Sequence, residues 1–303
     1  MKSIVTGGAG FIGSHLIEAL VCQGIKVSII DNLVSGQLGI IHPLAVLHQM
    51  DICSKEAKDV IIRDKPDVVF HLAAQTDVQK SLLDPQYDAE VNISGTINLL
   101  EACREAKVRK LIFASTSAVY GDLQKELISE EDPVAPISYY GLSKCAAESY
   151  IRLFHQLYGS PYTILRFSNV YGPGQMAKGE GGVVAVFLDR IHRKKQLSIH
   201  GAGEQTRDFI YVKDVVRAIL AAVERGDQET LQVSSSRNTS INQLVSMLSR
   251  IHGSAVDIVH TSTRKGDVKH SCLDNRKAFQ LLHWQPLVHL PDGLTDTYAY
   301  SKK

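Results

Sequence analysis

The stretch Val5-Thr6-Gly7-Gly8-Ala9-Gly10-Phe11-Ile12-Gly13 decides the fold of this 303-residue chain. It follows a short apolar run typical of a strand, and it opens a longer run with helical periodicity. Gly7 permits a tight turn, Gly10 lets the backbone approach a pyrophosphate, and Gly13 allows close packing of the helix on the strand. An anion would then lie at the N-terminus of the helix. The stretch therefore predicts the phosphate-binding turn of a dinucleotide site.

Around this turn, short apolar runs alternate with longer helical patterns through the first 170 residues. Strands are predicted at residues 3–6, 26–30, 46–49, 68–72, 110–115 and 162–167, and helices at residues 11–23, 54–64, 85–106 and 140–158. This alternation is typical of a parallel sheet covered by helices on both faces. The predicted fold class is therefore α/β, with a Rossmann-type doubly wound parallel sheet.

The regular alternation of strands and helices ends after Asn169, where glycine-rich loops separate shorter helices and strands. We therefore divide the chain into a dinucleotide-binding Rossmann domain, residues 1–170, and a smaller C-terminal α/β region, residues 171–303, that mainly binds the substrate. An apolar run followed by a helical pattern suggests that residues 208–225 return to the main domain. No repeat, low-complexity tract or flexible linker interrupts this plan.

Composition excludes several functional classes. The 33 Lys and Arg residues nearly balance the 32 Asp and Glu residues, so no global field would recruit nucleic acid or an anionic membrane. The five cysteines are scattered without a Cys-x-x-Cys pair, which fits a reducing cytoplasm. No apolar run reaches the roughly 18 residues of a membrane span, so we expect neither an anchor nor a signal peptide. The histidines of the C-terminal region lack metal-ligand spacing, and no metal site is expected.

Asp31 indicates which dinucleotide is bound. It ends the second predicted strand, at about the distance after Gly13 that the glycine motif requires. A carboxylate there can accept hydrogen bonds from the adenosine ribose diol and would repel a 2′-phosphate, so NAD is favoured over NADP. The alternative without a cofactor is a chance glycine-rich turn with a surface aspartate. It is disfavoured because the glycine spacing, the strand-turn-helix context and the position of Asp31 coincide. His71, after the fourth strand, is interpreted as a paired core histidine rather than a catalyst.

Tyr140 and Lys144 are the candidate catalytic pair. They are four residues apart on a predicted helix, so both side chains project from one face. A tyrosine pKa of about 10 must fall towards neutrality to make a general base, and a nearby ammonium and an oxidised nicotinamide would lower it. Ser115-Thr116-Ser117 ends the fifth predicted strand, at the edge where ligands bind in open α/β sheets. We choose Thr116 as the hydroxyl that orients a substrate alcohol.

These motifs together resemble the extended short-chain dehydrogenase/reductase superfamily, and specifically the NAD-dependent epimerase/dehydratase family. The resemblance is carried by residues 7–13, 31–32, 51–52, 71–74, 115–121, 140–144, 166–174, 207–208 and 264–267. It implies a 4-epimerase of UDP-sugars that interconverts UDP-glucose and UDP-galactose through a transient 4-keto sugar. It also implies a homodimer, formed by the helices at residues 85–106 and 140–158 of two copies.

The resemblance assigns ligand contacts residue by residue. The implied NAD contacts are Gly7, Gly10, Phe11, Ile12, Gly13, Asp31, Asn32, Asp51, Ile52, Leu72, Ala73, Ala74, Asn92, Ser115, Tyr140, Lys144 and Phe167. The implied UDP-sugar contacts are Ser81, Thr116, Ser117, Tyr140, Asn169, Val183, Val184, Arg207, Arg264, Asp267 and Ser271. The chemistry is consistent, because two guanidinium groups can clamp a pyrophosphate and a carboxylate can accept from a ribose hydroxyl.

Departures from the family pattern bear on specificity. Sugar-nucleotide 4,6-dehydratases carry an Asp-Glu pair after the catalytic threonine, whereas this chain has Ser117 and Ala118, which argues against dehydration. Tyr139 stands where the family usually has proline, and the spacing of the Tyr-x-x-x-Lys pair selects Tyr140. Ser271 stands where glucose-restricted 4-epimerases carry a bulky tyrosine. This smaller residue would leave room for a 2-acetamido group, so UDP-GlcNAc and UDP-GalNAc are also expected substrates.

Two other functions use the same sequence features. An NAD(P)H-linked nucleotide-sugar reductase or dehydrogenase would use the same catalytic residues but exchange its cofactor with solution, so a retained cofactor favours the epimerase. A non-catalytic NAD-sensing regulatory protein is the alternative of another class, because function does not follow from fold alone. The complete set of Tyr140, Lys144 and Thr116 argues against it.

Overall fold

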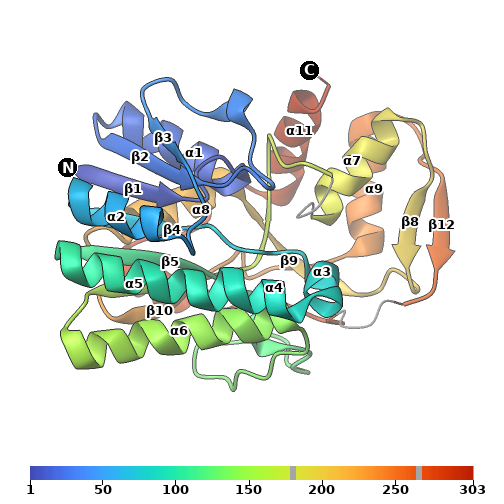
Figure 1. Cartoon of the computed structure of the whole chain (residues 1–303). Helices are drawn as coiled ribbons and strands as arrows, with labels where there is room; N and C mark the ends of the chain where they lie inside the picture. Colours follow the sequence, from blue (N-terminus) through green and yellow to red (C-terminus); the bar gives the residue numbers. More distant parts are fainter. Residues whose placement is uncertain (178–181, 264–267, 303) are drawn as a thin grey trace.

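The computed structural model describes residues 1–177, 182–263 and 268–302, and a seven-stranded parallel sheet dominates that part of the chain (Figure 1). The strand order is β10-β6-β5-β4-β1-β2-β3. The strands are β1 (Lys2–Thr6), β2 (Lys26–Asp31), β3 (Val46–Gln49), β4 (Val68–His71), β5 (Lys110–Thr116), β6 (Tyr162–Phe167) and β10 (Glu229–Val233). The six predicted strands are confirmed to within one residue at each end, whereas the sequence did not predict β10.

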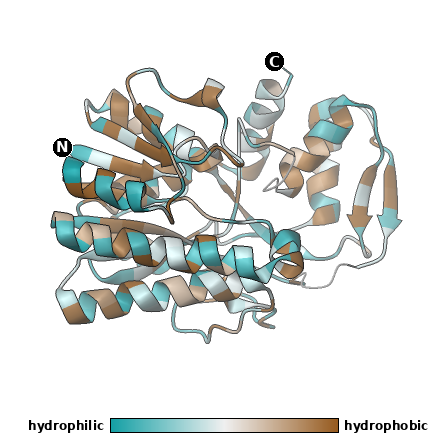
Figure 2. Cartoon of the chain, in the orientation of Figure 1, coloured by the Kyte–Doolittle hydropathy of each residue, from teal (hydrophilic) through white to brown (hydrophobic). Residues whose placement is uncertain are grey.

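Helices cover both faces of the large sheet, which confirms the doubly wound plan. One face packs against α1 (Phe11–Cys22) and α8 (Val212–Ala221) in one apolar core. The other packs against α2 (Lys55–Asp64), α5 (Gly95–Ala106) and α6 (Tyr139–Tyr158) in a second core. Because central strands such as β4 and β6 are buried throughout, they are mostly apolar rather than alternating. Figure 2 shows hydrophobic stretches in β1 and β2 of the same sheet.

The ends of α6 follow from its sequence. Ser138 is the N-cap residue, and its side-chain oxygen accepts a hydrogen bond from the backbone N–H of Gly141. Gly159 ends the helix in the left-handed conformation, with φ of +67°. These two signals fix a 20-residue helix whose buried face lies against β5 and β6.

The helix predicted over residues 85–106 is not uniform. It begins as α4 (Pro85–Ala89), passes through a π-helical turn at Glu90–Ser94 and continues as α5. The hydroxyl of Thr96 donates to the carbonyl of Asn92, while the Asn92 side chain leaves the helix to bond the backbone of Gln75. A π-helical turn of this kind is frequent at functional sites. The preceding short helix, α3 (Val78–Leu83), was not predicted.

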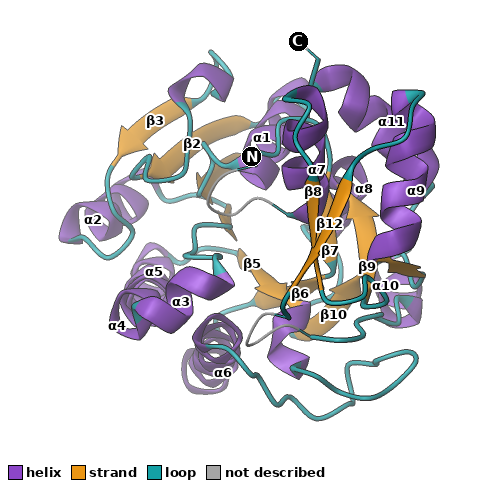
Figure 3. Cartoon of the chain, turned by 90° about the vertical axis from the view of Figure 1, so that its right-hand side faces the viewer, coloured by secondary structure: helices purple, strands orange, loops and turns teal. Residues whose placement is uncertain are grey.

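The C-terminal residues build two small sheets beside the large one (Figure 3). A three-stranded sheet has the order β11-β9-β7, and a two-stranded sheet pairs β12 with β8. The strands are β7 (Asn169–Tyr171), β8 (Leu197–His200), β9 (Thr206–Tyr211), β11 (Asn238–Ser240) and β12 (Ile258–Thr261), and the helices are α7 (Val183–His192), α9 (Ile241–His252), α10 (Arg276–Leu282) and α11 (Leu290–Tyr300).

The expected return of residues 208–225 to the main domain was wrong for the strand. β9 pairs with β7 and β11, so it belongs to the three-stranded sheet. The helix that follows, α8, does pack against α1 in the core of the large sheet. It is β10 that joins the edge of the large sheet, by parallel pairing with β6. Among the described residues, no helix is both long and apolar enough to cross a membrane.

Candidate functional site

The glycine-rich turn between β1 and α1 is shaped by close contacts. Gly7 has φ of +70°, and a Cβ atom placed on it would lie 2.6 Å from the backbone nitrogen of Ala73. A Cβ atom on Gly13 would lie 2.2 Å from the carbonyl oxygen of Gly7. Gly10 caps α1 without a side-chain hydrogen bond, so the turn offers a narrow cradle before the helix N-terminus. This geometry fits a pyrophosphate group.

A pocket of about 360 Å³ lies at the carboxyl edge of the large sheet and brings most of the expected cofactor residues together. Its lining includes Gly7, Gly10, Phe11, Ile12, Gly13, Asp31, Asn32, Asp51, Ile52, Leu72, Ala73, Ala74, Ser115, Thr116, Tyr140, Lys144 and Phe167. These residues come from β2, β5, β6, α1 and α6 and from the loops that follow β1, β2, β3 and β4. The carboxyl edge of the sheet therefore gathers residues distributed over 160 positions of sequence into one cavity.

Asp31 lines the pocket and also bonds the backbone of the glycine-rich turn. One carboxylate oxygen accepts from the backbone N–H of Ala9 in the glycine-rich turn, at 2.9 Å. The other accepts from the backbone N–H of Leu33, at 2.8 Å. The side chain is 7% exposed, so the carboxylate is fixed in direction as well as in place. It stands at the end of β2, where a ribose diol would meet it.

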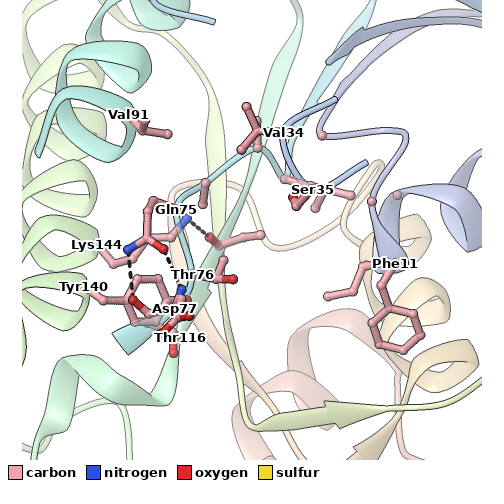
Figure 4. A pocket seen from close by; sticks show the side chains of 18 of the residues that line it. Phe11, Val34, Ser35, Gln75, Thr76, Asp77, Val91, Thr116, Tyr140 and Lys144 are labelled. Atoms are coloured by element: carbon pink, nitrogen blue, oxygen red, sulfur yellow. Dashed lines mark hydrogen bonds between the residues drawn. The ribbon is translucent and has the colours of Figure 1, made fainter. Parts of the chain in front are cut away.

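Tyr140, Lys144 and Thr116 lie together on one side of the pocket, opposite Phe11 (Figure 4). The Lys144 side chain is 2% exposed, and its Nζ donates to the carbonyl oxygen of Ala114 on β5, at 2.9 Å. Thr116 accepts from the backbone N–H of Ala118, which caps the short turn after β5. The hydrogen bond of Lys144 thereby joins α6 to β5 within the lining of the pocket.

The structure distinguishes the two adjacent tyrosines at the start of α6. Tyr140 lines the pocket, whereas Tyr139 does not line it and is 46% exposed. The spacing argument from Lys144 therefore selected the side chain that faces the cavity.

A second pocket, of about 200 Å³, adjoins the first beyond Tyr140. Thr76, Tyr140, Ser168, Val170 and Gln175 line both pockets, so the two cavities meet at these residues. The far side of the second pocket is the start of α7, and the expected substrate residues Asn169, Val183 and Val184 are part of its lining. Gly182, the N-cap residue of α7, also lines this pocket, so the N-terminal turn of the helix borders the cavity.

Comparison with known proteins agrees with this site. The model of the NAD-dependent epimerase/dehydratase family matches residues 3–234. The chain belongs to the NAD-dependent epimerase/dehydratase family. Its structure has a TM-score of 0.98 with a Thermotoga maritima UDP-glucose 4-epimerase solved with UDP-glucose, at 43% identity over 100% of this chain and 99% of the other. A Thermus thermophilus UDP-glucose 4-epimerase in complex with NAD gives 0.96, at 35% identity over 100% and 99%.

A further relative shows that the family spans several sugars. A UDP-glucuronate 4-epimerase of Thermodesulfobacterium geofontis is 33% identical over 99% of this chain and 96% of that protein. Family membership confirms the resemblance read from the motifs, the Rossmann-type fold class, and NAD as the cofactor of this enzyme class. The sugar on which the chain acts is a separate question.

Several residues that the family resemblance assigns to ligands do not line either pocket. Asn92 is 2% exposed and lies behind the wall of the first pocket, where its side chain bonds the backbone of Gln75 and the hydroxyl of Ser143. Ser81 is fully buried and donates to the carbonyl of Val78. Asn92 therefore supports the pocket of the epimerase/dehydratase fold from outside its lining, whereas Ser81 bonds within its own helix.

The remaining expected substrate residues are dispersed. Ser117 and Ser271 do not line either cavity, and Ser271 is 7% exposed. Arg207 also lies outside both linings, with one guanidinium nitrogen donating to the carbonyl of Thr206. Arg264 and Asp267 lie outside the described residues.

Sequence reasoning missed part of the lining. The additional residues of the first pocket are Val34, Ser35, Gln75, Thr76, Asp77, Lys80, Tyr87, Val91, Ala114, Ser168, Val170 and Gln175. Gln75, Thr76 and Asp77 directly follow the predicted contact Ala74 after β4, so the carboxyl-edge rule could have found them. Lys80, Tyr87 and Gln175 reach the pocket only through the packing of distant loops and helices, for which the local sequence holds no signal.

His71 is confirmed as a paired core histidine. Its ring is 1% exposed, with Nδ1 2.8 Å from the hydroxyl of Thr6 and Nε2 3.0 Å from the hydroxyl of Thr96. Burial, reinforced by the charge of Lys144, lowers the pKa of His71 from 6.5 to about 3. The ring therefore stays neutral in the folded enzyme at ordinary pH.

This burial predicts a loss of stability in mild acid. Below about pH 6.5 the unfolded chain binds a proton at His71, whereas the folded chain does not until about pH 3. The His71 contribution is therefore complete above pH 6.5 and falls by about 1.4 kcal/mol per pH unit well below it. We expect urea unfolding to show that His71→Gln reduces this pH slope, compared with the exposed control His260→Gln. An unchanged slope would contradict a neutral buried ring.

The cofactor preference of this family member should depend on Asp31. Asp31→Asn keeps an acceptor beside Ala9 but removes the charge, and a hydrogen bond to a charged group is worth about 1.5–3 kcal/mol. We expect NAD affinity to fall by about 10- to 100-fold and discrimination against NADP to narrow. Titration of both cofactors measures this, with the exposed Asp59→Asn on α2 as the control. Equal weakening of NAD and NADP would show that Asp31 only supports the turn.

Proposed function

We propose that the chain is an NAD-dependent 4-epimerase of UDP-sugars that interconverts UDP-glucose and UDP-galactose. The observation that carries the proposal is the position of Tyr140, which lines both the cofactor pocket and the adjoining pocket at the start of α7. A proton-transfer group at the junction of two cavities can serve a sugar held in one beside a cofactor held in the other. The intact Tyr140, Lys144 and Thr116 set favours this enzyme over a non-catalytic NAD sensor.

The second pocket is suited to a diphosphate. The N-terminus of α7 offers the backbone N–H groups of Val183 and Val184 and a partial positive charge. We infer that UDP is anchored there, with Asn169 in the same lining and with Arg207, Arg264 and Asp267 as further contacts implied by the family resemblance. An anchored diphosphate leaves the sugar as the part of the substrate that can turn beside Tyr140.

The chain's own residues would then move one proton. Bound NAD supplies the reversible hydride acceptor for carbon 4 of the sugar. Tyr140 as a phenolate takes the proton from the sugar 4-hydroxyl and later returns it to the 4-keto oxygen. Lys144, fixed at the carbonyl of Ala114, keeps a positive charge near the phenolate, and Thr116 directs the sugar oxygen. Because the sugar turns over between the two transfers, the configuration at carbon 4 inverts.

Substrate range and by-reactions follow from smaller features. Ser117 and Ala118 supply no acid to protonate a departing hydroxyl, so dehydration is disfavoured. Ser271 does not line either pocket, so its support for 2-acetamido sugars rests on the family resemblance alone. We retain UDP-GlcNAc and UDP-GalNAc as proposed additional substrates.

We also propose that two copies associate through α5 and α6. These helices lie side by side on one face of the molecule (Figure 1), and α6 carries exposed apolar residues along it. They include Leu142, Tyr150, Leu153 and Leu157, which are 40–61% exposed. Exposed apolar patches of this kind mark association sites. Sedimentation equilibrium would measure the mass of the particle in solution and so test the homodimer.

The location of the protein in the cytoplasm stays a prediction.

The deciding experiment uses purified protein with no added cofactor. UDP-galactose, UDP-GalNAc and UDP-glucuronate are incubated separately, and NMR follows the appearance of each 4-epimer. We expect conversion of UDP-galactose with NAD carried by the protein. Activity only with added NAD(P)H, and a reduced product, would support the nucleotide-sugar reductase instead. Conversion of UDP-glucuronate alone would keep the epimerase chemistry and replace the proposed sugar.

A further inference from the structure

A buried ion pair lies directly behind the catalytic residues. Glu148 on α6 is fully buried, and both of its oxygens accept from Arg166 on β6, at 2.9 Å from Nε and 2.6 Å from Nη2. Arg166 is 4% exposed and also donates to the phenolic oxygen of Tyr120, at 2.7 Å. Arg152, one turn further along α6, donates to Glu148 at 2.6 Å. Burial opposes ionisation of Glu148, but the hydrogen bonds and charge of Arg166 hold its pKa below the ordinary value.

This ion pair reaches the wall of the cofactor pocket. The hydroxyl of Ser115, which lines that pocket, donates to Glu148 at 2.6 Å. Lys144, four residues before Glu148, donates to the carbonyl of Ala114. Tyr140, Lys144 and Glu148 follow one another at helical spacing, so one face of α6 contacts the end of β5 twice. Ser115, an expected cofactor contact, therefore also connects β5 to the buried carboxylate of Glu148.

Stability alone is a poor explanation for such a pair. The desolvation of two buried ions often exceeds their attraction, and apolar residues of similar size commonly give equal or greater stability. Removal of one partner, in contrast, leaves an uncompensated charge in a region of low dielectric. Glu148 and Arg166 neutralise one another at a distance from which either alone would act on the proton affinity of the tyrosine.

We propose that Glu148 and Arg166 are positioning residues that fix α6 on β5 and keep the charge behind Tyr140 balanced. This rests on the proposed role of Tyr140 as the proton-transfer group. With the pair intact, Lys144 is the protein cation that, beside the bound nicotinamide, sets the proton affinity of Tyr140. When one partner is removed, the charge that remains shifts the pKa of Tyr140. Glu148 alone raises this pKa, and Arg166 alone lowers it.

The size of the bias follows from helix geometry. Residues 140 and 148 are separated by about 12 Å along the axis at 1.5 Å per residue. A unit charge at that distance, with an effective dielectric constant of about 20, shifts a pKa by about one unit. The charged and titratable groups that interact with Glu148 are Cys145 and Arg152 from α6 and Arg166 and Tyr162 from β6. Tyr120, from the turn after β5, contacts Arg166, and Lys144 lies one helical turn before Glu148 on α6. Arg152 compensates part of the charge, so one unit is an upper value for Arg166→Met.

The test is a titration of the Tyr140 phenol in the NAD-bound protein. Tyrosinate absorbance is followed against pH for the wild type, Glu148→Gln, Arg166→Met and the double variant, each with its own Tyr140→Phe background subtracted. Glu148→Gln leaves a guanidinium that stays charged, so we expect the Tyr140 pKa to fall by up to about one unit. Arg166→Met should raise it, and the double variant should return it to near the wild-type value.

Opposite shifts that cancel in the double variant support the proposal, because a purely structural role would not give two signs. No shift, or shifts of one sign in both single variants, would overturn it. If Arg166→Met does not fold, Arg152→Met, whose side chain is 35% exposed, gives a smaller shift of the same sign. Lys58→Met, which breaks an ion cluster between α2 and residues Glu101 and Glu105 of α5, is the control and should not shift the titration.

The titration also separates this inference from the proposed activity. The absorbance of Tyr140 can be measured whether or not the protein epimerises a UDP-sugar. If the NMR experiment finds no epimerase activity, the phenol titration still supports or overturns the balanced charge pair. If activity is found, the pH dependence of kcat should shift in the same directions as the absorbance.

Discussion

Tyr140→Phe lowers kcat for the UDP-galactose reaction by about 10²- to 10⁴-fold, the range that a positioned general acid or base contributes. The phenylalanine ring keeps the packing of Tyr140 but has no proton to exchange with the sugar oxygen. We expect KM for UDP-galactose to change little, because the proposed diphosphate anchor lies at the start of α7. Steady-state kinetics at several pH values measures the effect, and cofactor content is checked in the same preparation.

The adjacent residue supplies the matched control. Tyr139→Phe removes a hydroxyl from the same helix turn, but Tyr139 is half-exposed and lies outside the pocket. We expect it to retain nearly full kcat. If kcat fell strongly in Tyr139→Phe and little in Tyr140→Phe, Tyr139 rather than Tyr140 would be the proton-transfer group. Loss of NAD in Tyr140→Phe would indicate a binding role rather than proton transfer.

Gly7→Ala should cost about 2–5 kcal/mol of folding free energy and remove bound NAD from the purified protein. The left-handed conformation of Gly7 is strained for alanine by about 1–2 kcal/mol. Its new methyl group would also lie 2.6 Å from the backbone of Ala73, so the loop after β4 must move. Because Ala73 lines the same pocket, that movement disrupts the cofactor cradle as well as the fold.

Gly24→Ala separates strain from contact. Gly24 has nearly the same φ, +72°, but a Cβ atom placed there meets nothing within 4 Å. We expect Gly24→Ala to lower the folding free energy only by the conformational strain, about 1–2 kcal/mol, and to keep its bound NAD. Urea unfolding and the NAD content of each purified variant measure the two effects. Equal losses of NAD in both variants would contradict a steric requirement at Gly7.

The sequence located the centre of the site because the relevant signals are local. The glycine spacing, the carboxylate after β2 and the Tyr-x-x-x-Lys pair each occur within one strand-turn-helix unit or one helix face. Parallel strands bring their carboxyl ends to one edge, so residues after separate strands meet without further information. For this reason all the expected cofactor residues except Asn92 line the first pocket.

Predictions failed where long-range packing decides the outcome. β9 was expected in the large sheet, and β10 takes the edge position instead by pairing with β6. Both are short strands of mixed polar and apolar residues, and their sequence periodicity cannot indicate which sheet offers the better partner. Packing also decides what the Asn92 amide contacts, because its partners Gln75 and Ser143 lie on other elements of the fold.

The sequence by itself determined the fold class, the six strands of the dinucleotide-binding half and NAD as the cofactor, and it predicted the pair Tyr140 and Lys144, which the structure places in one pocket. These follow from short-range periodicity and from motifs whose spacing has one geometric solution. Only the tertiary structure decided the meeting of the two pockets at Tyr140 and the burial of Glu148 against Arg166 behind it. The physical reason is that burial and charge pairing depend on which distant side chains exclude water from a group, and that is set by packing rather than by neighbours in the chain.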